Sequence, residues 1–318
     1  MKDNEDMKIL VTGSHGLVGS AMVRQLHEYG YWNILTPTHS ELDLLDEVRT
    51  QAYLNLVHPE MVICCAAKVG GIGGNSKDNY GFLLENMRIN QNTISCSFDT
   101  GVKNLVFLGS SCIYPKFAHQ PIKETELLSG SLEPTNEGYA LAKITGIKMC
   151  EFLRRQHGVR YYSLMPCNLY GIGDNYNIET GHVLPTLIAK FVNAKESGAS
   201  SVVLWGDGSP LREFLFADDL AEAVVSTFNI PSNELPDLMN IGSSDEISIK
   251  DLACIVKEVV GYAGDIEWDR SKPNGTPRKV MDCSLLKKLS KWRPSTPIVR
   301  GIERCYKDYL KNRERLRH

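Results

Sequence analysis

The 318-residue sequence lacks the patterns that mark several large classes of protein. Its nine cysteines are odd in number and none forms a Cys-x-x-Cys, so neither a disulfide framework nor a zinc site is indicated. No run of Lys and Arg is interleaved with aromatic residues, and the net charge is −3, which argues against a nucleic-acid surface. No apolar stretch approaches the length of a membrane span, so no membrane partner is expected.

Targeting and metal signals are also missing. Met1–Asp6 is acidic and polar rather than a basic, apolar leader, so we expect a cytoplasmic protein in a reducing compartment. Asp218 and Asp219 are interpreted as the charge pair at a helix N-terminus, since metal ligands would need more clustering. No metal is therefore expected. With 42% hydrophobic residues, the chain can bury a large core, and its length favours one large and one smaller lobe.

Short apolar runs alternate with longer helical patterns over the first half of the chain. The runs lie at residues 8–12, 32–36, 61–66, 104–109 and 161–166. This alternation predicts an α/β fold, a Rossmann-type doubly wound parallel sheet with helices on both faces. Ligands of such sheets collect at the carboxyl ends of the strands.

The alternation breaks after Gly171 into longer loops. We expect residues 1–170, with about 214–242, to form an NADP-binding Rossmann domain, and about 171–213 with 243–318 to form a smaller, interleaved α/β substrate-binding lobe. The helical patterns at 79–100 and 137–157 carry more apolar residues than one sheet contact needs. They would suit a homodimer through a four-helix bundle.

A glycine-rich turn, Thr12-Gly-Ser-His-Gly-Leu-Val-Gly19, follows the first predicted strand and opens a helix. Gly13 allows the tight turn, Gly16 lets the backbone approach phosphates, and Gly19 lets helix and strand pack closely. The predicted dinucleotide contacts are Gly13, Ser14, His15, Gly16, Leu17, Val18 and Gly19. Because the second strand ends in Thr36-Pro37-Thr38-His39 without a carboxylate, and His15 and His39 can face a phosphate, NADP is favoured over NAD.

Two sets of residues are suited to proton transfer. Tyr139 and Lys143 are four apart and share a helix face, and we expect the ammonium to lower the pKa of the phenol from about 10. Ser110 ends a strand in register with them. Cys112 and His182 form a second pair, able to remove a proton from carbon on one side of a substrate and return it on the other. The order of these residues indicates isomerisation coupled to reduction.

Together these motifs resemble the extended short-chain dehydrogenase/reductases and, within them, the GDP-L-fucose synthase family. The matching segments span nearly the whole chain: Ala66-Ala-Lys-Val-Gly-Gly-Ile72, Gly109-Ser-Ser-Cys-Ile-Tyr-Pro115, Asn168-Leu-Tyr-Gly171, Gly181-His-Val-Leu-Pro185, Leu211-Arg-Glu-Phe214 and Gly275-Thr-Pro-Arg-Lys279. Two departures are visible, since Cys167 stands where the family has threonine and Ile172-Gly173 replaces Pro-His.

The resemblance implies an enzyme that epimerises GDP-4-keto-6-deoxy-D-mannose at C3 and C5 and then reduces C4 with NADPH. Ser110, Tyr139 and Lys143 would form the reductase triad, and Cys112 and His182 would serve epimerisation. It implies cofactor contacts at Leu108, Gly109, Ser110, Ser111, Lys143, Pro166, Cys167, Asn168, Leu169 and His182. It implies sugar-nucleotide contacts at Lys190, Trp205, Arg212 and Asp269. Since a substrate pyrophosphate needs cations, Lys279 is a further candidate.

Other interpretations remain open. A sugar-nucleotide 4-epimerase or 4,6-dehydratase would share the fold, although such a dehydratase would carry Asp-Glu at Ser111-Cys112. A non-enzymatic redox sensor could dispense with Tyr139 and Lys143. Taken alone, Cys112 is more often a small core residue, His182 a surface residue and Trp205 part of the packing.

Overall fold

Six short strands form one parallel sheet in the computed structural model, which describes residues 4–272 and 274–313. The strand order is β2-β1-β3-β4-β5-β9, and every neighbouring pair is parallel. Their near-continuous burial explains the apolar runs in the sequence, because both faces of the sheet are covered. The strands are β1 (Ile9–Thr12), β2 (Ile34–Leu35), β3 (Met61–Cys64), β4 (Asn104–Leu108), β5 (Arg160–Pro166) and β9 (Leu238–Ile241).

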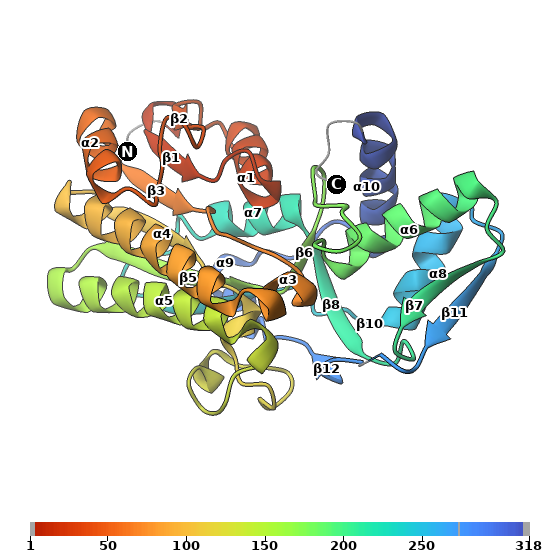
Figure 1. Cartoon of the computed structure of the whole chain (residues 1–318). Helices are drawn as coiled ribbons and strands as arrows, with labels where there is room; N and C mark the ends of the chain where they lie inside the picture. Colours follow the sequence, from red (N-terminus) through yellow and green to blue (C-terminus); the bar gives the residue numbers. More distant parts are fainter. Residues whose placement is uncertain (1–3, 273, 314–318) are drawn as a thin grey trace.

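Two groups of helices cover this sheet (Figure 1). The first group packs α2 against α4 and α4 against α5, and the second packs α1 against α7. This arrangement confirms the predicted Rossmann-type doubly wound sheet. The helices are α1 (Leu17–Glu28), α2 (Glu47–Val57), α3 (Ile72–Lys77), α4 (Asn79–Asp99), α5 (Glu137–His157), α7 (Ala217–Ser226) and α9 (Ser284–Ser290).

The longest helices of the larger lobe, α4 and α5, are 21 residues each and lie side by side (Figure 1). A buried amide joins them, since Asn90 Nδ2 donates to the Ala142 carbonyl at 2.9 Å. Polar residues such as Asn86 also lie in their buried positions. Among the helices of the described residues, none is long and apolar enough to cross a membrane.

The smaller lobe is built around β8 (Leu211–Phe216). This strand pairs with β6 (Asn168–Tyr170) and β12 (Arg278–Lys279) in parallel and with β10 (Glu246–Ser248) in antiparallel orientation. A second, two-stranded sheet joins β7 (Ser201–Trp205) to β11 (Asp265–Asp269). Helices α6 (Val183–Ser197), α8 (Ile249–Val260) and α10 (Ile298–Asn312) pack with them (Figure 1). Short 3-10 helices lie at η1 (Asn4–Asp6), η2 (Ser111–Ile113), η3 (Glu124–Glu126) and η4 (Pro134–Asn136).

Two hydrophobic cores divide the molecule, and β8 contributes to both. Leu215 lies in the core beneath the large sheet, whereas its neighbours Phe214 and Phe216 lie in the core of the smaller lobe. This follows from the alternation of side chains along a strand. The segment from Met281 to Trp292 packs in the first core. We propose a division at these cores, which places that segment with the larger lobe although it falls within the range expected for the smaller one.

Candidate active site

The glycine-rich turn lies at the carboxyl end of β1, where the strand order changes direction between β1 and β3. Gly13 has a φ of +66°, and the Gly16 N–H donates to its carbonyl at 3.0 Å. A Cβ on Gly19 would lie 2.1 Å from the Gly13 oxygen, so a larger residue cannot be accommodated there. Gly16 is the N-cap residue of α1 and provides no side-chain cap. The first amides of α1 therefore remain available for an anion such as a pyrophosphate.

The loop after β2 holds a carboxylate that sequence reasoning missed. His15 and His39 are both exposed here. Glu41 accepts hydrogen bonds from the Thr38 N–H at 2.7 Å and the Thr38 hydroxyl at 2.8 Å. These bonds, and to a smaller extent the nearby charge of His15, lower the pKa of Glu41. The signal was the Thr38-x-x-Glu41 spacing, which has the form of a capping box.

The hydroxyl groups of Ser110 and Tyr139 meet at the carboxyl end of β4. Ser110 is the N-cap residue of η2, and its Oγ accepts a hydrogen bond from the Cys112 N–H at 3.2 Å. Burial and the proximity of Cys112 raise the pKa of Tyr139, and a hydrogen bond with Ser110 only partly opposes them. The expectation of a lowered phenol pKa is therefore wrong for this structure. Because desolvation outweighs the other effects, the phenol stays protonated at neutral pH and holds a proton that it can donate.

Lys143 lies on the same face of α5 as Tyr139, as the four-residue spacing predicts. Its side chain is only 3% exposed, and its Nζ donates to the Leu108 carbonyl at 2.8 Å. The ammonium lies 4.9 Å from the ring centre of Phe107 and 5.9 Å from that of Tyr139. Burial lowers the pKa of Lys143 to about 8. Lys143 is thus held at the carboxyl end of β4, and burial makes its positive charge energetically unfavourable.

Cys112 is half-buried in η2, and two donors contact its sulfur. Asn136 Nδ2 donates to Cys112 Sγ at 3.2 Å, and Lys279 Nζ lies 3.9 Å from the same atom. Asn136 immediately precedes α5, whereas Lys279 belongs to β12 of the smaller lobe. Sequence reasoning expected Lys279 to contact substrate and gave no role to Asn136.

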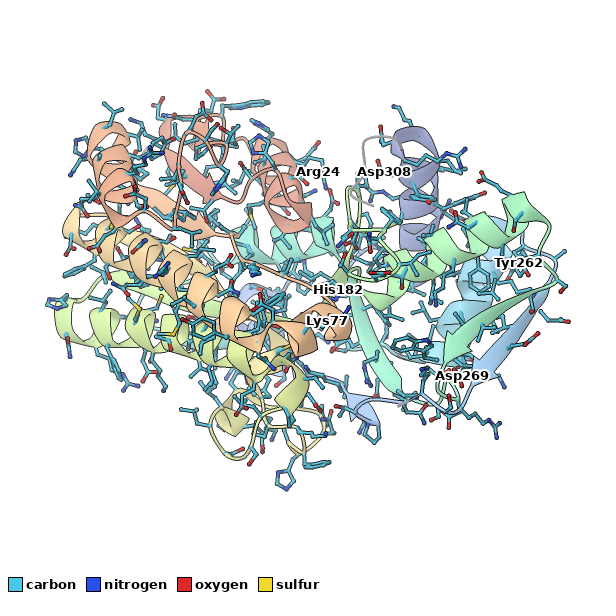
Figure 2. The ribbon with its side chains drawn as sticks, viewed as in Figure 1. Arg24, Lys77, His182, Tyr262, Asp269 and Asp308 are labelled. Atoms are coloured by element: carbon cyan, nitrogen blue, oxygen red, sulfur yellow. The ribbon has the colours of Figure 1, made fainter. Side chains whose placement is uncertain are left out.

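His182 is the N-cap residue of α6 and lies at the junction of the two lobes, as Figure 2 shows. Thr180, two residues before His182, accepts a hydrogen bond from the Gly71 N–H through its carbonyl at 3.0 Å, which ties this loop to the segment after β3. The imidazole is exposed to solvent, but the surrounding protein atoms lower its pKa by desolvation. A protonated His182 would therefore release its proton readily near neutral pH.

The residues after β5 form the passage between the lobes. Pro166 pairs with Ile241, and the Cys167 N–H donates to the Ile241 carbonyl at 2.9 Å. Asn168 begins β6, and its Nδ2 donates to the Glu213 carbonyl at 2.9 Å. These contacts anchor the predicted cofactor segment, which also includes Leu169, to β9 and β8.

Two cations of the smaller lobe lack an acidic partner within the described residues. Arg212 donates through Nη1 to the Leu211 carbonyl at 2.8 Å, and its register partner in β12 is Lys279. Lys190 lies half-buried on α6. Burial lowers the pKa of both Arg212 and Lys190. Both positive charges are therefore available to an anionic group.

Trp205 and Asp269 are far apart in sequence but are register partners at the ends of β7 and β11. The Trp205 ring is 66% exposed, with Lys272 Nζ 5.7 Å from its centre. The Asp269 carboxylate accepts from the N–H and the hydroxyl of Ser271, and these bonds lower its pKa. Figure 2 places Asp269 well away from His182, within the smaller lobe.

Comparison with known proteins decides the family. The family model described as "NAD dependent epimerase/dehydratase family" matches residues 9–242. The chain belongs to this family. It is 50% identical over 309 residues to GDP-L-fucose synthase 1 of Arabidopsis thaliana, covering 97% of this chain and 95% of that protein. It is 42% identical over 317 residues to the GDP-L-fucose synthase of Escherichia coli strain K12, covering 98% of each. The predicted resemblance is confirmed.

A solved structure has a closely similar fold. The GDP-L-fucose synthetase of Naegleria fowleri bound to NADP superimposes with a TM-score of 0.91 at 28% identity, covering 100% of this chain and 98% of that chain. The residues of this chain fit a dinucleotide in their own right. Gly13 and Gly19 are held where a Cβ would clash with backbone, and the first turn of α1 is uncapped.

The paired acidic residues expected at a helix start have structural partners. Asp218 lies in the first turn of α7 and forms a bidentate ion pair with Arg24, at 2.9 and 3.0 Å. Asp219 accepts from the N–H and hydroxyl of Thr296. Within residues 4–272 and 274–313, no group of three His, Cys, Asp or Glu side chains could hold a metal ion.

Proposed function

We propose that this protein converts GDP-4-keto-6-deoxy-D-mannose into GDP-L-fucose, by epimerising C3 and C5 and reducing C4 with NADPH. The observation that carries the proposal is that the Cys112 sulfur shares one site with the Ser110 and Tyr139 hydroxyls. A ketone reductase needs the hydroxyls but has no use for a sulfur base with two donors upon it. The relatives at 42% and 50% identity are named GDP-L-fucose synthases, which supports the proposal.

The C4 ketone of such a substrate explains why one pair of hydroxyls suffices. A carbonyl acidifies the C–H bonds on both flanking carbons, and either enolate places its charge on the same oxygen. Ser110 and Tyr139 donate hydrogen bonds to that oxygen and stabilise the charge. Removing one such donor raises the barrier by about 3–4 kcal/mol. A single oxyanion site therefore serves both epimerisations.

Cys112 and His182 move the protons. The Cys112 thiolate takes a proton from C3 or C5 and becomes a thiol, while the protonated His182 gives a proton to the opposite face of the same carbon. The two groups exchange protons with solvent before the next carbon reacts. The lowered pKa of His182 suits this role, because an imidazolium with a low pKa is the stronger acid.

Reduction completes the reaction. NADPH, when bound, supplies the hydride for C4. Tyr139 gives its phenolic proton to the C4 oxygen, and the Lys143 ammonium nearby stabilises the phenolate that remains. Residues Gly13 to Gly19 would hold the cofactor pyrophosphate, and Arg212 and Lys190 the pyrophosphate of GDP. Trp205 and Asp269 offer an exposed ring and a carboxylate to the sugar nucleotide.

We further propose a homodimer formed by α4 and α5 of two copies. Tyr80 and Met87 on α4, and Leu141 and Phe152 on α5, are large apolar side chains that are 73%, 38%, 41% and 51% exposed. Their spacing places each pair along one helix face, which supports a four-helix bundle. Phe152→Glu should yield a monomer in sizing by light scattering.

The nine free cysteines support a reducing, cytoplasmic location.

The decisive experiment follows NADPH absorbance after GDP-4-keto-6-deoxy-D-mannose is added and identifies the product by NMR. One NADPH should be consumed for each GDP-L-fucose formed. Cys112→Ala, mixed with the same substrate in D2O, should incorporate no deuterium at C3 or C5. Unchanged incorporation, or an unepimerised 6-deoxyhexose as the product, would refute the proposal. A 4-epimerase or 4,6-dehydratase would leave NADPH unconsumed.

Cofactor preference is a separate measurement. His15 and His39 favour the 2′-phosphate of NADPH. The Glu41 carboxylate, however, lies close enough to His15 for the charge of His15 to lower the pKa of Glu41. Since the Glu41 carboxylate already accepts two hydrogen bonds from Thr38, it is less available to a ribose hydroxyl, and we expect NADPH to be preferred over NADH. Initial rates with each cofactor decide this, and equal rates would show that the histidines do not select the phosphate.

A further inference from the structure

Asn136 occupies the N-cap position of α5 but does not cap the helix. An asparagine at this position ordinarily accepts a hydrogen bond from the first helical turn. In this structure the Asn136 side chain forms no such bond. Its Nδ2 donates instead to Cys112 Sγ at 3.2 Å. The amide is thus turned away from the helix and towards the sulfur.

This orientation leaves a polar atom without a partner. Asn136 Oδ1 is buried and accepts no hydrogen bond within the described part of the chain. A buried unsatisfied acceptor is destabilising, and a capping orientation would avoid that cost. The contact with Cys112 is therefore not explained by the stability of α5. The orientation of the Asn136 amide must instead have a role at the Cys112 sulfur.

Donors from different segments of the chain converge on that sulfur. Lys279 Nζ lies 3.9 Å from Cys112 Sγ and arrives from β12, which pairs with β8 in the smaller lobe. The start of α5, with its positive end of the helix dipole, also faces this region. An amide N–H and an ammonium both interact more strongly with a thiolate than with a thiol.

We propose that Asn136 is a positioning residue for the epimerisation step, whose amide, together with Lys279, holds Cys112 as a thiolate directed at the substrate. This inference rests on the proposed function, which makes Cys112 the base. Asn136 acts through Cys112 and does not itself exchange protons. A neutral amide suits this role because it donates to the sulfur without offering a competing base.

The first test measures the sulfur directly and needs neither substrate nor cofactor. Cys254 is exposed, so a Cys254→Ser background removes the main competing thiol, and burial already raises the pKa of Cys65 to about 12. Alkylation of the Cys112 peptide by iodoacetamide is followed by mass spectrometry from pH 5 to 10. Tyr139 and Lys279 are the other titratable groups near the sulfur, and both are kept.

Asn136→Ala and Asn136→Asp form the matched pair. The pH midpoint of alkylation should rise by about one unit in Asn136→Ala, as expected for loss of one hydrogen bond to a charged group. It should rise further in Asn136→Asp, because a carboxylate of the same shape repels a thiolate. Asp can also cap α5, so this variant should melt no lower than the parent. If the pH profiles of Cys112 alkylation coincide in the parent, Asn136→Ala and Asn136→Asp, the proposal is overturned.

The second test links the sulfur to the reaction. The kcat of deuterium incorporation at C3 and C5 in D2O should be about tenfold lower in Asn136→Ala than in the parent. KM should be unchanged, because the substrate site is intact. A shifted alkylation profile with normal incorporation would overturn the link to epimerisation. If the parent does not turn over the sugar nucleotide at all, the proposed function fails, but the alkylation profiles still decide whether Asn136 holds the thiolate.

Discussion

The reducing and the epimerising halves of the site are assembled differently. Ser110, Tyr139 and Lys143 come from β4, η2 and α5 of the larger lobe, and Lys143 is almost fully buried against Leu108. In contrast, His182 is exposed at the start of α6, and the Cys112 sulfur is contacted by Lys279 of the smaller lobe. One half is therefore fixed within a single core, whereas the other depends on how two lobes meet.

The physical reason for this difference is burial. The core beneath the sheet desolvates Tyr139 and Lys143 and so determines their ionisation, raising the pKa of one and lowering that of the other. The epimerising half is closer to solvent and relies on direct contacts with its sulfur. We expect substitutions in the two halves to affect reduction and epimerisation to different extents.

The largest effect expected is that of Tyr139→Phe. Loss of the phenolic acid should lower NADPH oxidation by roughly 10²–10⁴-fold, since no other group donates a proton to the C4 oxygen. Deuterium exchange at C3 and C5 should slow by a smaller factor, because one of the two oxyanion donors is lost while Ser110, Cys112 and His182 are unchanged. NADPH absorbance and proton NMR of the same sample measure both steps. An equal fall in both would show that the halves do not act separately.

Lys143→Met tests the cost of the buried ammonium. Its pKa of about 8 lies below the ordinary 10.5, so between these values the unfolded chain binds more protons and the parent gains stability as the pH rises. Below pH 8 both states are protonated and the penalty is constant, on the order of 3 kcal/mol. The free energy of unfolding of Lys143→Met minus that of the parent should therefore decrease from pH 8 to 10.5.

Urea titrations of the two proteins at several pH values measure this difference. The comparison isolates Lys143, because the other titrating groups are common to both chains. Met cannot donate to the Leu108 carbonyl, so the absolute difference contains a further constant loss of about 1–3 kcal/mol. A difference that does not change with pH would show that Lys143 is not desolvated.

The smallest effect is expected for Lys279→Met. If Lys279 acts at Cys112, the kcat of deuterium exchange should fall about tenfold and KM should hardly change. If it binds the substrate pyrophosphate instead, KM should rise while kcat is kept. Lys190→Met is the matched control, since Lys190 has no contact with the sulfur among the described residues and is expected to change KM. Equal changes in kcat and KM in Lys279→Met and Lys190→Met would show that Lys279 has no separate role at the Cys112 sulfur.

Much of the fold follows from local patterns. The apolar runs at β3 and β4 predict strands covered on both faces, and the glycines of the first turn permit a close backbone approach that a Cβ would block. The shared helix face of Tyr139 and Lys143 also follows from spacing alone. These predictions succeed because they depend on residues close together in the chain.

Other features depend on contacts that spacing does not encode. Asn136 and Lys279 are 24 and 167 residues from Cys112, and Glu41 becomes relevant only because the loop after β2 lies near His15. The direction of the Tyr139 pKa shift was wrong from sequence because the extent of burial around α5 was unknown. The roles of Lys190, Trp205, Arg212 and Asp269 stay predictions.

The sequence by itself determined the parallel sheet, the dinucleotide turn and the identities of the groups able to move protons, since each is written in short-range spacing or residue chemistry. Only the tertiary structure decided which donors reach the Cys112 sulfur and how strongly Tyr139 and Lys143 are desolvated. The reason is that ionisation and hydrogen bonding depend on the atoms that packing brings together, wherever in the chain those atoms originate.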